Sequence, residues 1–202
     1  MPDVPDAAES PDDPTRRPLR ADARQNVDAL LEAAKAEFAR AGVDAPVRAI
    51  AERAGVGVGT VYRHFPLRSD LISAVFRREM DACVDAAVEL EAAYPPGEAL
   101  DRWVLRYTEF VATKQGLAAA LHSGEPAYEP LAVYFSTRLA PTLERLLAAA
   151  SAAGAIRTTV EPTEFLGAVA NLCHSDNPLT RAPGRAERMV GLLLAGLRAP
   201  AG

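Results

Sequence analysis

The sequence predicts an all-α protein in which a three-helix N-terminal unit precedes a larger helical body. Ala, Leu, Arg and Glu, which favour helices, dominate a 202-residue chain that is 49% hydrophobic. Apolar residues recur at helical spacing, and long runs of β-branched alternation are absent. The chain is long enough for a small domain plus a larger one. Its helix-breaking residues divide it into a tail (1–20), the N-terminal unit (21–67), a connecting helix (68–93) and the body (94–200).

The N-terminal tail and the first helix differ sharply in pattern. Residues 1–20 are rich in Pro and Asp and lack periodic apolar residues, so we expect them to be disordered. Asp22, with Gln25 three residues later, resembles a helix capping box. An apolar stripe then continues to Gly42, which predicts a first helix that begins at Asp22 and ends before this glycine.

Residues 46–71, PVRAIAERAGVGVGTVYRHFPLRSDL, predict two short helices joined by a glycine-rich bend. Apolar residues at helical spacing in 47–54 form the first helix, and Pro46 suits its first position. Gly55 suits the left-handed residue that follows a helix end. The three residues 55–57 then supply the bend that a helix-turn-helix requires.

The second short helix runs from Val58 to about His64 and can bury only Val61 and Phe65. The residues left outside are small, hydroxylic, aromatic or basic: Val58, Gly59, Thr60, Tyr62, Arg63 and His64. A helix that enters the major groove of DNA needs small residues at its leading end and hydrogen-bond donors along its length. This segment has both.

A long amphipathic pattern from Arg68 to about Ala93 predicts a continuous helix that joins the N-terminal unit to the body. Residues 94–97, Tyr-Pro-Pro-Gly, end it. Because its first turn lies beside the short helices and its far end lies in the body, this helix is a mechanical link between them.

The body is predicted to contain further helices that begin near Gly97, Tyr128 and Pro162. Pro141 should kink or divide the second of these. The last helix, Arg185 to about Arg198, is apolar on more than one side. It therefore needs two burying surfaces, its own domain and a partner subunit.

The segment AIAERAGVGVGTVYRHFPLRSDL resembles the DNA-binding signature of the TetR family of bacterial transcriptional repressors, over about residues 24–80. The resemblance implies a homodimer, paired through its last two helices, that binds double-stranded operator DNA and releases it when a small-molecule effector binds. We expect a cytoplasmic protein, because the N-terminal sequence has no apolar core of signal-peptide length. It implies DNA contacts from the recognition helix and the start of the next helix: Val58, Gly59, Thr60, Tyr62, His64 and Arg68. Of these, His64 and Arg68 would hold phosphates.

Gly57 and Leu67 depart from the family pattern, because serine is common at both positions and would cap a helix there. Ala45 replaces a frequent threonine. The missing caps at Gly57 and Leu67 support an alternative hypothesis, a helical small-molecule-binding protein of the same fold that has lost operator binding. The presence of Tyr62, His64 and Arg68 argues against it.

The charge distribution agrees with DNA binding in the N-terminal unit. The whole chain has a net charge of −5, but residues 16–79 carry 12 Lys and Arg against 8 Asp and Glu, a net of +4. Arg48, near the positive end of its helix, either reaches a phosphate or is simply exposed. Arg16, Arg17 and Arg20 either belong to a solvated tail or form an arm that reaches a minor groove.

Aromatic and polar residues of the body are candidates for an effector pocket, since ligands of the resembled family sit between these helices. They are Trp103, Tyr107, Phe110, His122, Tyr134, Phe135, Phe165, Asn171 and His174. The alternative is that aromatics at helical spacing form plain core. No inward-facing charged cluster is evident, so we expect an apolar or aromatic effector.

Enzyme motifs are absent, because the chain has no GxSxG, P-loop or HExxH sequence, and no cofactor is expected. Cys173 and His174 are adjacent and cannot chelate one metal from a helix, so no metal site is expected. Cys83 and Cys173 are predicted to be buried free thiols. No stretch reaches the roughly 20 apolar residues of a membrane span, and no membrane partner is expected.

Overall fold

The computed structural model describes residues 16–112, 126–173 and 184–198, and in these ranges it contains helices and no strands. The all-α prediction is confirmed. The elements in chain order are α1 (Arg16–Ala41), α2 (Val47–Ala54), α3 (Val58–His64), α4 (Arg68–Ala93), α5 (Pro96–Ala112), the 3-10 turn η1 (Pro126–Tyr128), α7 (Glu129–Ala152), α8 (Pro162–Cys173) and α9 (Arg185–Arg198).

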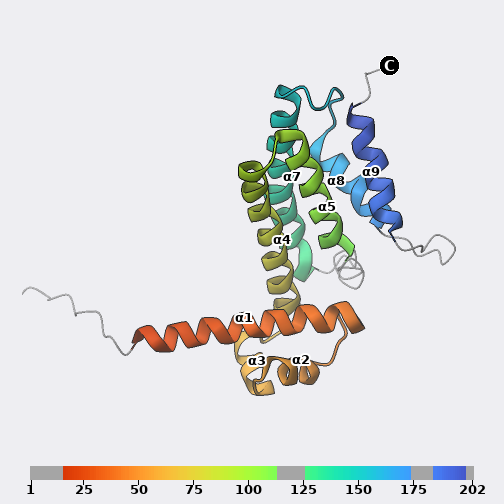
Figure 1. The fold of residues 1–202 in the computed structure, drawn as a ribbon. Helices are drawn as coiled ribbons and strands as arrows, with labels where there is room; N and C mark the ends of the chain where they lie inside the picture. The colour runs from red at the N-terminus through yellow and green to blue at the C-terminus, as the bar shows by residue number, and fades with distance from the viewer. Residues whose placement is uncertain (1–15, 113–125, 174–183, 199–202) are drawn as a thin grey trace, which may run out of the picture.

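Helices α1, α2 and α3 form the N-terminal unit, in which α1 lies across the two short helices (Figure 1). Their apolar faces meet in one core with the first turns of α4: Leu30, Ala34, Phe38, Ile50, Ala51, Val61, Leu71 and Ile72. The bend between α2 and α3 depends on Gly55, whose φ of 69° is left-handed. As predicted, this glycine ends α2, and the amide of Val56 donates back to the carbonyl of Ala51.

Two details at helix starts differ from the sequence-based expectations. Helix α1 begins at Arg16 rather than at Asp22, so residues 16–20 are helical and not part of a disordered tail. No strong helix breaker separates Arg16 from the apolar stripe except Pro18, which a first turn tolerates. Pro46 lies just before α2, as its extended N-cap, rather than at its first helical position.

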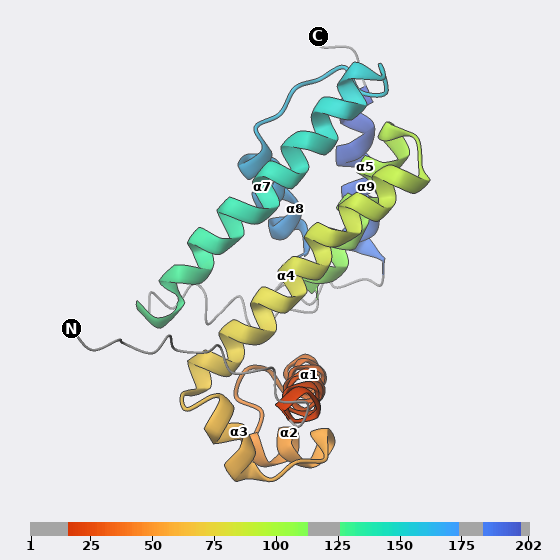
Figure 2. The ribbon, with the colours of Figure 1, turned by 90° about the vertical axis from the view of Figure 1, so that its left-hand side faces the viewer.

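Helix α4 carries the chain from the N-terminal unit into the body (Figure 2). It packs against α1 near its start and against α5 and α7 further along. One face is buried for most of its length: Leu71, Ile72, Val75, Phe76, Met80, Cys83 and Ala87. The predicted continuous helix is confirmed, and its buried face contacts both the N-terminal unit and the body.

The body is a layered bundle in which α5 and α7 lie beside α4, and α8 and α9 cover α5 and α7 (Figures 1 and 2). Helix α7 runs unbroken through Pro141, so of the two predicted outcomes, a kink or a division near Leu139, the division is wrong. Pro141 lies on the exposed side of the helix, where water can bond to the carbonyl that the missing N–H leaves free.

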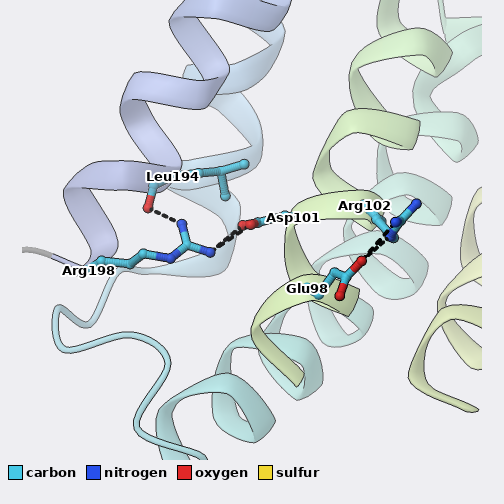
Figure 3. A network of polar contacts seen from close by, with 5 residues as sticks. All are labelled: Glu98, Asp101, Arg102, Leu194 and Arg198. Atoms are coloured by element: carbon cyan, nitrogen blue, oxygen red, sulfur yellow. Dashed lines mark hydrogen bonds and ion pairs between the residues drawn. The ribbon is translucent and has the colours of Figure 1, made fainter. Parts of the chain in front are cut away.

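A polar network fixes the end of α9 to the start of α5 (Figure 3). Nη2 of Arg198 donates to both carboxylate oxygens of Asp101, at 2.8 and 2.7 Å, and Nη1 donates to the carbonyl of Leu194 at 3.1 Å. Beside Asp101 on α5, Arg102 donates to Glu98, which lies one turn nearer the start of the helix. The terminal helix is therefore held by charge as well as by its buried residues.

Candidate DNA-binding surface and effector site

Helix α3 presents the face that the sequence predicts for DNA. Val61 is buried at 1% exposure, whereas Tyr62 is 52% exposed and Val58 is 38% exposed. Arg63 and His64 are exposed, and Thr60 is half-buried. The structure therefore brings the predicted contact residues of α3 together on one outward surface, at the end of the molecule farthest from α9 (Figure 1).

The leading end of α3 is open to close approach. Gly57 is the extended N-cap residue and offers no capping side chain. A methyl group added at Gly57 or Gly59 would meet nothing within 4 Å. Backbone amides at this end are thus reachable by a phosphate or a base edge, which fits the predicted role of the small residues.

The missing cap at Leu67 is partly replaced within α4. The backbone amide of Leu67 donates to Oδ2 of Asp70 at 2.9 Å, which satisfies one amide at this helix start. The departure from the family pattern at this position therefore leaves the helix start intact.

Two basic side chains of α3 are available to a polyanion. Within the described residues, Arg63 and His64 form no ion pair. Arg48 is exposed on α2, and its Nε lies 3.0 Å from Oε1 of Glu52. An exposed i,i+4 pair is worth about 0.3–0.5 kcal/mol, so a phosphate could compete for Arg48.

Arg68 has a different environment from the one the resemblance implies. Its Nε donates to the carbonyl of Val43 at 2.7 Å, and its Nη2 donates to the carbonyl of Ala45 at 2.5 Å. The guanidinium of this half-buried residue is thus bound to the loop between α1 and α2. In this arrangement it positions the loop, and a phosphate contact would have to use the remaining N–H groups.

The sequence analysis missed Glu37, a buried acid in the N-terminal unit. Its carboxylate accepts from Arg40 at 2.7 Å and from Arg53 of α2 at 2.8 Å. Hydrogen bonds from Arg40 and then Arg53 lower the pKa of Glu37 below its ordinary value of 4.5. The signal was present in the helical spacing, which places Glu37 on the same face as Leu30 and Ala34.

Four predicted pocket residues form the aromatic core of the body: Trp103, Tyr107, Phe110 and Phe165. Their polar groups are satisfied internally, since Trp103 Nε1 donates to the carbonyl of Cys83 at 2.8 Å and Tyr107 Oη to that of Leu166 at 3.3 Å. Burial raises the pKa of the Tyr107 hydroxyl. These four side chains are therefore buried in the core of the body.

The other predicted pocket residues that the structure describes are less buried: Tyr134 and Phe135 pack against the edge of this cluster, and Asn171 lies outside it. Tyr134 is half-buried, and its hydroxyl donates to Oδ1 of Asp81 at 2.6 Å, which ties α7 to α4. Asn171 is exposed. The ring of Phe135 lies 6.3 Å from that of Tyr107. His122 and His174 lie outside the described residues.

A cavity of about 300 Å³ lies beside the aromatic core, where α1, α4 and α5 meet. It is lined by Lys35, Glu79, Cys83, Arg106, Glu109 and Phe110. Of the predicted pocket residues that the structure describes, Phe110 alone lines it. Four charged residues face this space, although the sequence shows no inward-facing charged cluster.

The cysteines are free and buried, as predicted. Burial raises the pKa of the Cys173 thiol to about 11. No group of three metal-ligating side chains occurs in the described ranges. Among the same residues, no helix is both long and apolar enough to cross a membrane.

The N-terminal unit and the body each match the model of a known protein family. Residues 30–75 match the family model of bacterial regulatory proteins, tetR family, and residues 95–199 match that of the transcriptional regulator SbtR-like C-terminal domain. The chain belongs to the TetR family of bacterial transcriptional regulators. The α2–α3 surface is therefore the DNA-binding helix-turn-helix of a TetR-family protein, and such regulators are not enzymes.

Solved structures of TetR-family proteins share this fold over nearly their whole length. The regulator SCO0520 from Streptomyces coelicolor is 36% identical, with a TM-score of 0.68 over 86% of this chain and 99% of that one. A regulator from Mycobacterium vanbaalenii is 37% identical, with a TM-score of 0.67 over 90% of this chain and 100% of that one.

A third structure, described as the molecular basis for control of antibiotic production by bacterial hormones, is 26% identical, with a TM-score of 0.67 over 89% and 98% of the two chains. HTH-type regulators of Staphylococcus aureus are 34% identical over 77 residues, which span 38% of this chain and 42% of those relatives.

Proposed function

We propose that this TetR-family protein is a homodimeric cytoplasmic repressor that binds an operator through α3 and releases it when a small-molecule effector binds. The observation that carries the proposal is the outward face of α3, where exposed Tyr62, Arg63 and His64 surround a single buried valine. Nothing in the N-terminal core needs these side chains, so their exposure favours a role in binding.

The contacts divide by chemistry. Arg63 and Arg48 supply positive charge for phosphates, and His64 can donate a ring N–H to one, which fixes the position of the protein on the duplex. Thr60, at the leading end of α3, is small enough to approach base edges and to act as donor or acceptor. Tyr62 combines an apolar ring with a hydroxyl and can contact sugar or phosphate.

Dimerisation through α8 and α9 is supported by their outer surface. Leu192 of α9 is 65% exposed, which is unusual for a large apolar side chain. On the same helix, a methyl group added at Gly191 or Gly196 would meet nothing within 4 Å, and the same holds for Gly167 of α8. Small residues let two helices approach closely, and Leu192 would then be buried against the partner subunit.

Effector control would act through α4. This helix is packed in the N-terminal core at one end and against α5 and α7 at the other. An effector that favours one arrangement of the body would tilt α4 and change the separation of the two recognition helices in the dimer. The relative described in terms of control by bacterial hormones supports small-molecule control.

Fluorescence anisotropy tests the proposal, with DNA flanking the coding region and scrambled DNA of equal length across a salt series. We expect tight binding that scrambled DNA does not match and that weakens steeply with salt. The variant Thr60→Val should change sequence preference more than overall affinity. Equal affinity for every DNA in a random-sequence selection would contradict the proposed function.

A further inference from the structure

The cavity at the junction of α1, α4 and α5 has buried apolar residues at its base and more exposed charged residues at its opening. Its floor consists of Cys83 and Phe110, which are 1% and 5% exposed. Its charged residues are more accessible, since the side chains of Lys35, Arg106 and Glu109 are 37%, 46% and 67% exposed. A polar opening above an apolar floor is the arrangement of a binding site for a small amphipathic molecule.

The position of each lining residue follows from helix geometry. Glu79 and Cys83 are four residues apart on one face of α4, and Arg106, Glu109 and Phe110 share one face of α5. The two faces are joined at the base, where the rings of Phe76 and Phe110 lie 5.9 Å apart. The third wall is Lys35 of α1, from the DNA-binding unit.

The charges at the opening occur as two ion pairs. Nζ of Lys35 lies 2.8 Å from Oε2 of Glu79, and Nη1 of Arg106 lies 3.1 Å from Oε2 of Glu109. A ligand with one negative group would gain Lys35 and Arg106 but face two carboxylates. A ligand with one positive group would face two cations. A head group that carries both charges can pair with both kinds of side chain.

We propose that this cavity binds a small zwitterion whose apolar part rests on Phe110 and Cys83 and whose charged head lies among Lys35, Glu79, Arg106 and Glu109. The volume of about 300 Å³ is at the lower end for ligand pockets and suits a molecule of amino-acid size. The aromatic core described above is filled by its own side chains, and this site shares only Phe110 with the predicted aromatic pocket.

Occupation of the site would act on the link between the two parts of the molecule. The Lys35–Glu79 pair joins α1 to α4, and a ligand carboxylate competes with Glu79 for Lys35. Arg78 keeps other contacts with α1, through Asp28 and Glu32, so the ligand loosens one side of the junction only. This step rests on the proposed function, whereas binding itself does not.

Calorimetry on the full-length protein tests binding without DNA, using three probes that share a phenyl ring: phenylalanine, phenylacetate and phenethylamine. Phenylalanine should bind at least about tenfold more tightly than either singly charged probe. Arg106→Gln should weaken the binding of phenylalanine and phenylacetate but not that of phenethylamine. Glu109→Gln should weaken the binding of phenylalanine and phenethylamine but not that of phenylacetate.

Arg102→Gln is the matched control, because Arg102 lies one turn away on α5, also pairs with a glutamate, and does not line the cavity. It should leave all three affinities unchanged. Failure of all probes to bind at up to roughly 10 mM, equal affinities for the three, or equal effects of Arg102→Gln and Arg106→Gln would each overturn the proposal. Because no DNA is present, these outcomes are independent of operator binding.

Discussion

Removal of the Arg68 side chain separates a structural role for this residue from a phosphate contact. Arg68→Ala deletes two hydrogen bonds, to the carbonyls of Val43 and Ala45, at 2.7 and 2.5 Å. Hydrogen bonds to a charged group contribute about 1.5–3 kcal/mol when buried. The site is half-buried and water can reach the freed carbonyls, so we reduce this to about 1 kcal/mol each.

The expected loss is therefore about 2 kcal/mol in the free energy of unfolding of the N-terminal unit. For a chain of this length, that corresponds to a fall of about 4–8 °C in Tm. The measurement is urea and thermal unfolding of the full chain followed by circular dichroism. Arg68→Lys should recover part of the loss, because an ammonium group can reach one carbonyl but lacks the fork geometry.

The matched control for Arg68 is Arg48→Ala, which removes an exposed arginine of the same unit and should change the free energy of unfolding by less than about 0.5 kcal/mol. If Arg68→Ala were as stable as the wild type and instead reduced the salt dependence of DNA binding by about one phosphate contact, the structural role would be refuted. Arg68 would then be the phosphate ligand that the family resemblance implies.

Three further predictions concern the DNA surface, the dimer and the buried acid. Tyr62→Ala should weaken binding to all DNA sequences, on the order of tenfold or more, without changing Tm, as measured by anisotropy and thermal unfolding. Leu192→Glu should shift the protein to monomers in sedimentation, because it places a charge in the apolar contact between subunits. Glu37→Gln should destabilise the protein above pH 4.5, and the difference from the wild type should shrink as pH falls through the lowered pKa of Glu37, because the Arg40 and Arg53 contacts stabilise only its charged form.

Each of these has an outcome that contradicts it. Unchanged affinity of Tyr62→Ala on every DNA would remove Tyr62 from the interface. Val133→Glu is the control for Leu192→Glu, because Val133 is 59% exposed on α7, and an equal effect on the oligomer would place the contact elsewhere. A pH-independent difference between Glu37→Gln and wild type would show that charge on Glu37 does not stabilise the fold.

The helix-turn-helix could be predicted almost residue by residue because its determinants are local. Gly55 sets the bend, Val61 alone faces inward in α3, and the bounds of α3 follow from these two constraints. The start of α1 could not be predicted in the same way. The capping pattern at Asp22 does not fix where the helix begins, because the residues that precede it can also adopt helical conformation.

The candidate effector site was less predictable, because a cavity forms only where neighbouring helices move apart from one another. Helical spacing places Trp103 and Tyr107 inward, but whether such residues line a cavity or fill a core is decided by packing between elements. The charged cavity joins Lys35 of α1 to Arg106 of α5, residues far apart in the sequence. No local pattern brings them together.

The most direct test of the account is selection of DNA from a random-sequence library, by the wild type and by Arg63→Ala. We expect the wild type to enrich an inverted repeat whose half-sites are separated by about one helical turn or a multiple of it. Arg63→Ala should enrich the same repeat but hold it more weakly, because its contact is to phosphate. No enriched repeat from the wild-type protein would contradict sequence-specific binding through α3.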